Sequence, residues 1–167
     1  MRHSIAELNR MSQEEFVRVV GPVFEHSPWI ANDAAANRPF ADFDELHRQL
    51  CQMVRAAPVE KQLGLIKAHP DLAARGVLTA ESAREQISAG LDKLQPEESS
   101  AIRLQNQAYR EKFGFPFVIC ARLNNKDSIA AAFTRRLTHS PQQEIQTALE
   151  EIFKIAALRL RDLCQPD

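Results

Sequence analysis

The sequence contains few of the residues on which several classes of protein depend. Five glycines and one tyrosine occur among 167 residues, and the glycines form no glycine-rich phosphate-binding loop. The three cysteines, Cys51, Cys120 and Cys164, are odd in number and far apart, so they form neither a CxxC metal pair nor a disulfide framework. We expect most of these thiols to be buried.

Charge and hydrophobic length exclude further classes. The formal net charge is −1 at pH 7, which gives no general attraction to nucleic acid or to an anionic membrane. No apolar run approaches the roughly 18 residues of a membrane span, and the first seven residues carry an acid and lack an apolar signal core. The five histidines show no short metal-binding spacing such as HExxH. We therefore predict a cytoplasmic protein without a metal site.

Helix start signals recur along the whole chain. Ser12-Gln13-Glu14-Glu15 and Ser140-Pro141-Gln142-Gln143 have the spacing of a capping box, and Ser27-Pro28 predicts a helix that runs to about Asn37. Further starts are predicted at Asp42, Pro58, Thr79 or Ala80, Pro96, and Asn125 or Asp127. The sequence thus predicts an all-α protein, a single domain over residues 1–167 with about eight helices.

One apolar stretch does not fit a helical pattern. Residues 115–122 are dense in apolar side chains, with Gly114 and Pro116 near one end and Asn124-Asn125 after the other. A short buried strand and an irregular, extended segment fit this stretch equally well.

His69-Pro70 ends a predicted helix. Proline lacks a backbone donor and disfavours the α conformation of the residue before it. His69 therefore belongs at a helix end, where an imidazole can face a cavity. A structural histidine beside the helix C-terminus and a catalytic histidine both fit this position.

Two further features can carry chemistry or serve structure alone. Glu85 and Gln86 are adjacent on a predicted helix, and Ser82 lies one turn before Glu85, so these side chains suit either a polar pocket or a solvated helix face. Arg159 interrupts the most apolar part of the last helix. Because an unpaired buried arginine is expensive, it binds either an acidic side chain or an anionic ligand.

Four motifs together resemble the 2-oxo-4-hydroxy-4-carboxy-5-ureidoimidazoline (OHCU) decarboxylase family. They are Phe24-Glu25-His26-Ser27-Pro28-Trp29, His69-Pro70-Asp71-Leu72, Ser82-x-x-Glu85-Gln86, and Phe113-Gly114-Phe115-Pro116-Phe117-Val118-Ile119. Each motif alone is weak, but four in this order in a chain of this length are specific. The resemblance runs from about Leu8 to Leu163, and the chain length resembles a bacterial stand-alone form.

The resemblance implies a cofactor-free, all-helical homodimer that converts OHCU to (S)-allantoin, the last step from urate. It implies that His69 transfers the catalytic proton, and we hypothesise that Glu85 is a second catalytic residue, which orients His69 and acts on the leaving carboxylate. The substrate-binding residues that it implies are Pro70, Ser82, Ala83, Arg84, Glu85, Gln86, Phe117, Val118, Ile119, Cys120, Ala121 and Arg159.

The chemistry of such a substrate agrees with this composition. OHCU carries its carboxylate on a carbon next to a C=N bond, so the substrate itself accepts the electrons that decarboxylation releases. Neither pyridoxal phosphate nor a metal is needed. The enamine-like product must then be protonated on one face, a transfer suited to histidine.

An alternative function belongs to another class of protein. His-Pro-Asp between two helices is also the signature of the J-domain co-chaperones. In those domains a strongly basic helix precedes the loop, whereas residues 59–67 here are only mildly basic, and the other three motifs would go unexplained. A helical interaction module without enzymatic activity is a similar alternative.

Overall fold

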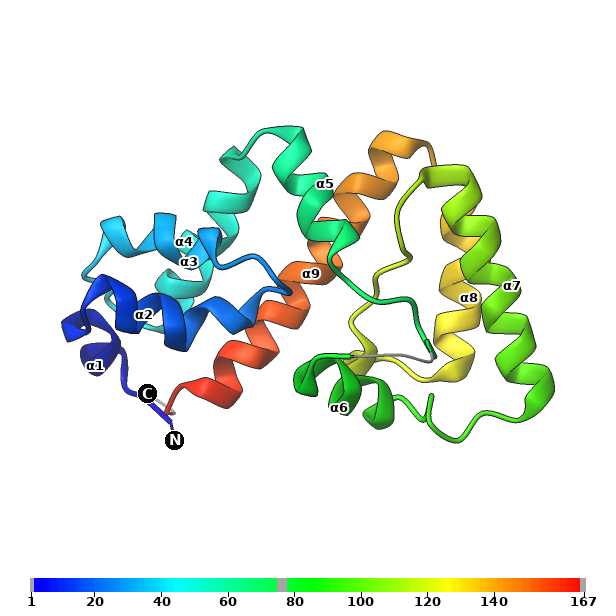
Figure 1. Cartoon of the computed structure of the whole chain (residues 1–167), viewed down its shortest axis with the longest axis horizontal. Helices are drawn as coiled ribbons and strands as arrows, with labels where there is room; N and C mark the ends of the chain where they lie inside the picture. Colours follow the sequence, from blue (N-terminus) through cyan, green and yellow to red (C-terminus); the bar gives the residue numbers. More distant parts are fainter. Residues whose placement is uncertain (1, 75–77, 166–167) are drawn as a thin grey trace. The chain divides into compact units, whose positions relative to one another are not determined.

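The computed structural model describes residues 2–74 and 78–165, and within them the predicted all-α class is confirmed. These residues form nine α-helices and three short 3-10 helices but no β-strand (Figure 1). The α-helices are α1 (Ile5–Arg10), α2 (Gln13–Val20), α3 (Trp29–Ala34), α4 (Phe43–Ala56), α5 (Val59–Lys67), α6 (Ala80–Ser88), α7 (Pro96–Phe113), α8 (Lys126–Arg136) and α9 (Pro141–Leu163). The 3-10 helices are η1 (Gly21–Val23), η2 (Ala35–Asn37) and η3 (Ala121–Leu123).

The chain divides into two compact units. Unit 1 consists of Met1–Ala68 and Phe153–Asp167, and unit 2 consists of His69–Ile152. The long helix α9 supplies residues to both units. A single domain over residues 1–167 therefore stays a prediction.

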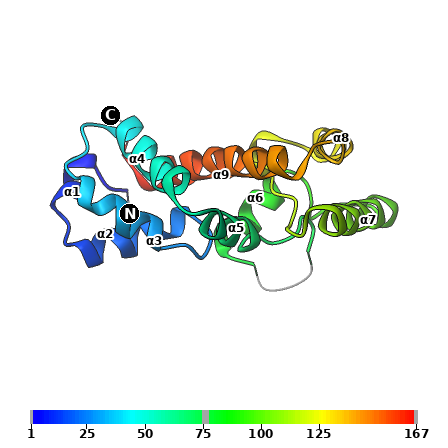
Figure 2. The same cartoon turned by 90° about the horizontal axis from the view of Figure 1, so that it is seen from above.

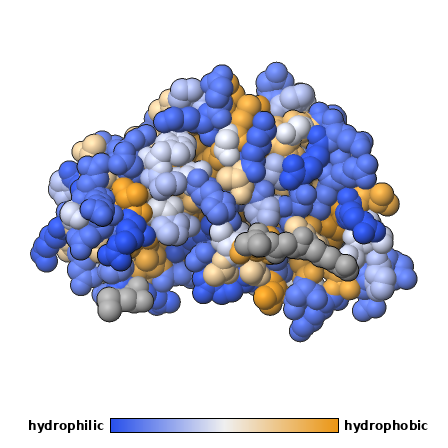
Figure 3. Space-filling model, viewed as in Figure 1, coloured by the Kyte–Doolittle hydropathy of each residue, from blue (hydrophilic) through white to orange (hydrophobic). Residues whose placement is uncertain are grey.

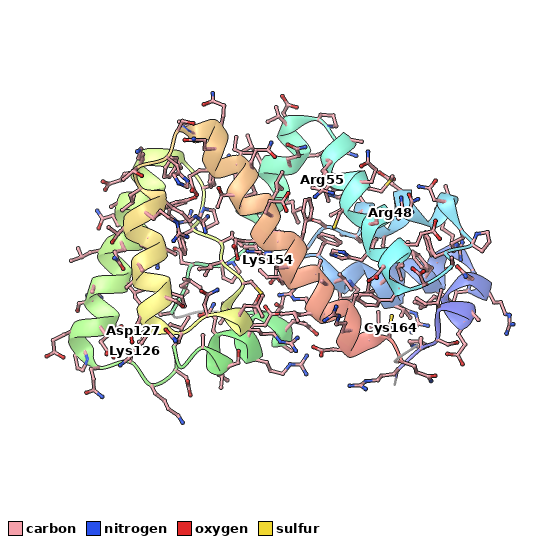
Figure 4. All side chains as sticks on the ribbon, turned by 180° about the vertical axis from the view of Figure 1, so that it is seen from behind. Arg48, Arg55, Lys126, Asp127, Lys154 and Cys164 are labelled. Carbon is pink, nitrogen blue, oxygen red and sulfur yellow. The ribbon has the colours of Figure 1, made fainter. Side chains whose placement is uncertain are left out.

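Unit 1 is built from α1 to α5 and the C-terminal part of α9. Helix α3 packs against α2 and α4, as Figure 1 shows on the blue and cyan side of the ribbon. Figure 4 labels Arg48 and Arg55 on α4, and the guanidinium of Arg55 lies 4.6 Å from the ring centre of Phe153. The apolar core of unit 1 includes Leu8, Phe16, Val20, Ile30, Leu46, Leu50, Val54 and Leu160.

Local capping explains where most helices begin. The predicted capping boxes at Ser12 and Ser140 are confirmed: Glu15 N–H donates to Ser12 Oγ at 3.2 Å, and Gln143 N–H donates to Ser140 Oγ at 3.3 Å. Asn125 caps α8, whose first residues Lys126 and Asp127 are labelled in Figure 4. A further capping box at Ser4 begins α1, a helix that the sequence analysis missed.

The turn before α3 differs from the prediction. The Ser27 hydroxyl does not cap the helix; it donates to the carbonyl oxygen of Glu25 at 2.9 Å. Helix α3 begins at Trp29, after Pro28, and ends at Ala34. The 3-10 helix η2 then continues to Asn37, so the predicted end of the helical stretch is confirmed although its last turn is tighter.

Unit 2 contains α6, α7, α8 and the N-terminal part of α9. Helices α7 and α8 lie side by side in both views of the ribbon (Figures 1 and 2). The apolar stretch 115–120 follows α7 in the chain, is neither helix nor strand, and leads into η3; the ring of its Phe117 contacts Tyr109 of α7 and Phe133 of α8. Every residue from 115 to 121 is buried. The predicted irregular apolar segment is confirmed, and the strand alternative is wrong.

Several properties of the described residues concern ligands and partners. All three cysteines are buried and unbridged, as predicted. No group of three or more His, Cys, Asp or Glu side chains in residues 2–74 and 78–165 could hold a metal ion. Hydrophilic side chains dominate the face drawn in Figure 3.

None of the described helices combines the length and the apolar character needed to cross a membrane.

Candidate active site

His69 stands where the sequence predicted, immediately after a helix end. Helix α5 ends at Lys67, and Ala68 is its C-terminal cap residue. His69 is 6% exposed, and Pro70 beside it is half-buried. A buried imidazole is shielded from bulk water, which suits a directed proton transfer.

The loop after His69-Pro70 is tied to two helices of unit 2. The side-chain oxygen of Gln86 accepts the Ala73 N–H at 2.8 Å, and the Gln86 amide nitrogen lies 3.5 Å from the Asp71 carbonyl oxygen. Asn106 of α7 donates to the carbonyl oxygen of Leu72 at 3.0 Å. Three consecutive residues are thus held by buried amide side chains, which fixes the chain just beyond His69.

Asp71, the third residue of the His-Pro-Asp sequence, is held by the same part of the molecule. Its carboxylate accepts from Arg110 Nε at 2.9 Å and 3.2 Å. Both side chains are partly exposed, so this pair contributes little to stability. It does tie Asp71 to α7 of its own unit.

Helix α6 has one buried and one solvated face. Ser82 and Gln86, one turn apart, are buried, whereas Arg84 is 73% exposed and lies 3.4 Å from Glu81. Glu85 is half-buried, at the margin between the faces, and so is Ala83. The solvated-face alternative is therefore correct for Arg84 but wrong for Ser82 and Gln86.

The predicted substrate-binding segment, Phe117 to Ala121, is wholly buried. Its Cys120 and Ala121 carbonyl oxygens accept local hydrogen bonds from Leu123 and Asn124, and two long-range bonds hold other backbone groups. Arg136 Nη1 donates to the Val118 carbonyl oxygen at 2.7 Å, and the Cys120 N–H donates to Glu151 Oε2 at 2.9 Å. These two groups have partners within unit 2. Recognition of a ligand by this segment would fall to its other backbone groups.

Helix α6 is the element that the predicted site residues of unit 2 share. Its Gln86 holds the loop that follows His69-Pro70, and its body packs against η3, which begins at Ala121. The structure therefore brings three of the predicted elements together: the loop after His69, the face of Ser82 and Gln86, and the end of the apolar segment.

Unit 2 contains a buried polar network that was not predicted from the sequence. Arg136 is 1% exposed and Glu144 is fully buried. Nε of Arg136 lies 3.1 Å and 3.0 Å from the two Glu144 carboxylate oxygens, and Nη2 lies 2.9 Å from Oε2. The Tyr109 hydroxyl donates to the same Oε2. Burial, together with this bond to Glu144, raises the pKa of Tyr109.

One sequence signal could have found this network. Ile129, Phe133 and Arg136 follow one another at spacings of four and three residues, so Arg136 lies on the apolar stripe of α8. A charged residue on such a stripe needs a buried partner. The partner, Glu144, lies across a helix boundary and has no comparable signal.

Arg159 lies in unit 1 and forms a buried ion pair there. Its Nη1 is 2.8 Å from Oε2 of Glu25, and both side chains are almost completely buried. Of the two alternatives for Arg159, the intramolecular salt bridge is confirmed, and a ligand-binding role stays a prediction. The pair also gives one residue of the Phe24–Trp29 motif a structural role.

Comparison with known families decides which family these motifs indicate. The model of the OHCU decarboxylase family matches residues 9–161, a span that contains all four motifs. The chain belongs to the OHCU decarboxylase family. This membership confirms the predicted family and the predicted enzyme class, a decarboxylase. It also argues against the co-chaperone and interaction-module alternatives.

Individual relatives agree with this assignment. The chain is 44% identical over 159 residues to a 2-oxo-4-hydroxy-4-carboxy-5-ureidoimidazoline decarboxylase of Haloferax volcanii, covering 95% of both chains. It is 41% identical over 157 residues to the uric acid degradation bifunctional protein PucL of Bacillus subtilis, covering 94% of this chain but 32% of that relative. It resembles the crystal structure of an (S)-allantoin synthase with a TM-score of 0.80 and 27% identity, covering 96% of this chain and 54% of that one.

These relatives bear on the predicted bacterial stand-alone form. The relative of similar length is archaeal, whereas the Bacillus relative is a longer, bifunctional protein. A family member of this length is thus not specifically bacterial, and a bacterial origin stays a prediction.

Proposed function

We propose that this protein decarboxylates OHCU to (S)-allantoin without a cofactor, as the last step of urate breakdown to allantoin. The observation that carries the proposal is the family match over residues 9–161. The buried His69 and the fixed loop that follows it support an active site in this part of unit 2.

The reaction proceeds in two stages, a decarboxylation and then a protonation. The bond between the ring carbon and the carboxylate breaks, CO2 leaves, and the electron pair forms a C=C bond to the neighbouring carbon as its C=N bond becomes a C–N bond to a protonated nitrogen. A proton then adds to that neighbouring carbon on one face, and the adjoining hydroxyl loses its proton to leave the carbonyl of allantoin. The net change consumes one proton and releases one CO2.

His69 is the proposed proton-transfer residue. Imidazole both takes up and releases a proton near neutral pH, and a positioned acid or base typically contributes roughly 10²–10⁴-fold to rate. The burial of His69 supports delivery of the proton to one face of the intermediate. Pro70, which ends the helix, is proposed to contact the substrate.

Glu85 is proposed to orient His69 and to act on the leaving carboxylate. Two like charges held close together raise the energy of the ground state, and loss of CO2 relieves that repulsion. The half-buried position of Glu85 supports this role because water would otherwise screen the interaction.

The remaining proposed contacts bind the planar parts of the substrate. Ser82 and Gln86, on the buried face of α6, would hydrogen-bond ring and ureido groups, and Arg159 would anchor carbonyl or carboxylate oxygens. Backbone groups of Phe117 to Ala121 would bind the amides. Arg84, which is exposed, and Ala83, which is half-buried, are proposed as further contacts from the same helix.

The proposed working form is a cytoplasmic homodimer with no nucleic-acid or membrane partner. Ile87 and Leu123 are large apolar side chains that are more than half exposed, and they lie on α6 and η3, which pack together. Light scattering on the purified protein tests this state, and a monomer mass would contradict it.

A coupled assay tests the proposed activity. The protein is added to urate, urate oxidase and hydroxyisourate hydrolase, and circular dichroism follows (S)-allantoin. Because OHCU also decays spontaneously to racemic allantoin, a dichroic product is the decisive signal. Racemic product at the uncatalysed rate would contradict the proposal, and stimulation of a chaperone ATPase would favour the co-chaperone alternative.

The variant His69→Asn tests the assigned proton-transfer residue in the same assay. We expect the dichroic signal to collapse while the far-ultraviolet helix spectrum is unchanged. Turnover and chirality like those of the wild type would remove His69 from the mechanism.

A further inference from the structure

The proposed mechanism makes no use of the charged side chains that anchor the segment Phe117 to Ala121. We propose that Arg136 and Glu151 are positioning residues that fix the two peptide planes on either side of Ile119. The proposal rests on the function proposed above, because it assumes that this segment binds the substrate.

The two anchors act on consecutive peptide units. Arg136 holds the carbonyl oxygen of Val118, which belongs to the peptide between Val118 and Ile119. Glu151 holds the N–H of Cys120, which belongs to the peptide between Ile119 and Cys120. Both peptide bonds are trans, and in a trans peptide the C=O and N–H point in opposite directions.

The directions of the Ile119 backbone groups follow from this geometry. Because the Val118 carbonyl points at Arg136, the Ile119 N–H points away from Arg136. Because the Cys120 N–H points at Glu151, the Ile119 carbonyl points away from Glu151. One residue thus presents a donor and an acceptor in fixed directions, the pair that a planar amide or ureide group requires.

The Leu123 N–H and Asn124 Nδ2 also hold the segment, but they donate to the Cys120 carbonyl oxygen, which belongs to the next peptide unit beyond these two. Residues 115–120 belong to no helix or strand, so neither an i→i−4 bond nor a strand ladder defines their backbone. Arg136 also contacts the preceding side chain, since its guanidinium carbon lies 4.2 Å from the ring centre of Phe117. A planar guanidinium that donates to one residue and stacks on its neighbour restricts both.

Arg136 is itself held from the opposite side. The Glu144 carboxylate accepts hydrogen bonds from Nε and Nη2 of Arg136. Tyr109 also donates to this carboxylate, and His139 Nδ1 lies 2.9 Å from Glu144 Oε1. Rotating the guanidinium away from Val118 would break several charge-assisted bonds at once. Buried ion pairs are often replaceable by apolar side chains without loss of stability, so stability alone does not account for this arrangement.

Kinetic constants separate positioning from a purely structural role. In the coupled assay, Glu151→Ala removes the acceptor of the Cys120 N–H, and we expect KM to rise about ten-fold, the effect of one hydrogen bond, with a fall in the enantiomeric excess of (S)-allantoin. Glu151→Gln keeps an acceptor oxygen and should restore both values. Arg136→Lys keeps the charge but loses the planar fork, and should also raise KM.

A matched control is Ile129→Val, two turns before Arg136 on α8, which removes buried apolar volume and no polar contact of the segment. A purely structural role predicts a smaller active fraction with unchanged KM and chirality in all these variants, and that result would overturn the proposal. If Arg136→Lys does not fold, the comparison of Glu151→Ala with Glu151→Gln tests the proposal by itself. Failure of the wild-type protein to yield (S)-allantoin would instead overturn the proposed function.

Discussion

The side-chain oxygen of Gln86 lies 2.8 Å from the peptide nitrogen of Ala73, four residues beyond His69. Ala73 has a φ of +54°, in the left-handed region that costs a non-glycine residue about 1–2 kcal/mol. The hydrogen bond that the Ala73 N–H donates to Gln86 offsets part of this strain. It therefore helps to define the path of the chain that leaves the candidate catalytic histidine.

Removing this hydrogen bond should reduce catalysis. We expect Gln86→Met to lower kcat/KM about ten-fold, because the net worth of a hydrogen bond is about 1 kcal/mol and more when its partner is left buried. Steady-state kinetics in the coupled assay measure the effect. Ile87→Met, on the exposed side of the same helix, is the control. Equal kinetics in the two variants would show that the loop does not need Gln86.

Glu85→Gln should separate rate from binding. The variant keeps the size of the side chain and one acceptor oxygen but loses the charge that is proposed to act on the leaving carboxylate. We expect kcat to fall roughly 100-fold and KM to change much less. Glu81→Gln, on the solvated face of α6, serves as the control. A KM effect larger than the kcat effect would assign Glu85 to binding instead.

The helix boundaries could be predicted where the signal is local. A capping box involves residues three apart, so Ser12 and Ser140 could be recognised without tertiary information. The same rule applies to Ser4, but α1 is only six residues long and has little apolar periodicity. The predicted N-cap at Ser27 was wrong because His26 adopts a φ of +46° in a turn beside Glu25. The partner of Glu25, Arg159, is 134 residues away.

The motifs of the candidate site could be predicted from the sequence, but the residues that hold its backbone in place could not. His69 and Gln86 stand in short motifs that a family resemblance can locate. Arg136 reaches Val118 across 18 residues and Glu151 reaches Cys120 across 31. Contacts at such separations depend on how helices pack, which no local pattern specifies.

Breaking the ion pair between Glu25 and Arg159 should strongly destabilise unit 1. Removing one partner leaves a buried charge uncompensated, so we expect Glu25→Ala to lower the free energy of unfolding by about 3–5 kcal/mol. Urea denaturation measures it. The double variant Glu25→Leu with Arg159→Met, which buries no charge, should lose less than Glu25→Leu alone. A single-variant loss below about 0.5 kcal/mol, the scale of a surface change, would contradict this expectation.

One tryptophan and one tyrosine report on the two units separately. Trp29 lies in unit 1 and Tyr109 in unit 2. Because α9 supplies Ile152 to one unit and Phe153 to the other, melting this helix removes core residues from both. We therefore expect the Trp29 fluorescence and the near-ultraviolet signal of Tyr109 to change at the same urea concentration, as in a single cooperative domain. Separate midpoints would indicate two domains.

The phenol of Tyr109 should resist ionisation in the folded protein. Burial, and then its hydrogen bond to Glu144, raise its pKa above the ordinary value of 10.0. A group whose pKa is raised on folding stabilises the protein fully below its unfolded pKa, and that contribution is lost as pH rises toward the folded value. Stability should thus begin to fall above about pH 10.

Titration of the phenol tests this prediction. Since Tyr109 is the only tyrosine, phenolate absorbance reports it alone. Tyr109 should titrate at the ordinary pH in urea and at a higher pH in the native protein, and Tyr109→Phe should abolish the signal. A native midpoint near 10.0 would mean that the hydroxyl is neither buried nor bound to Glu144.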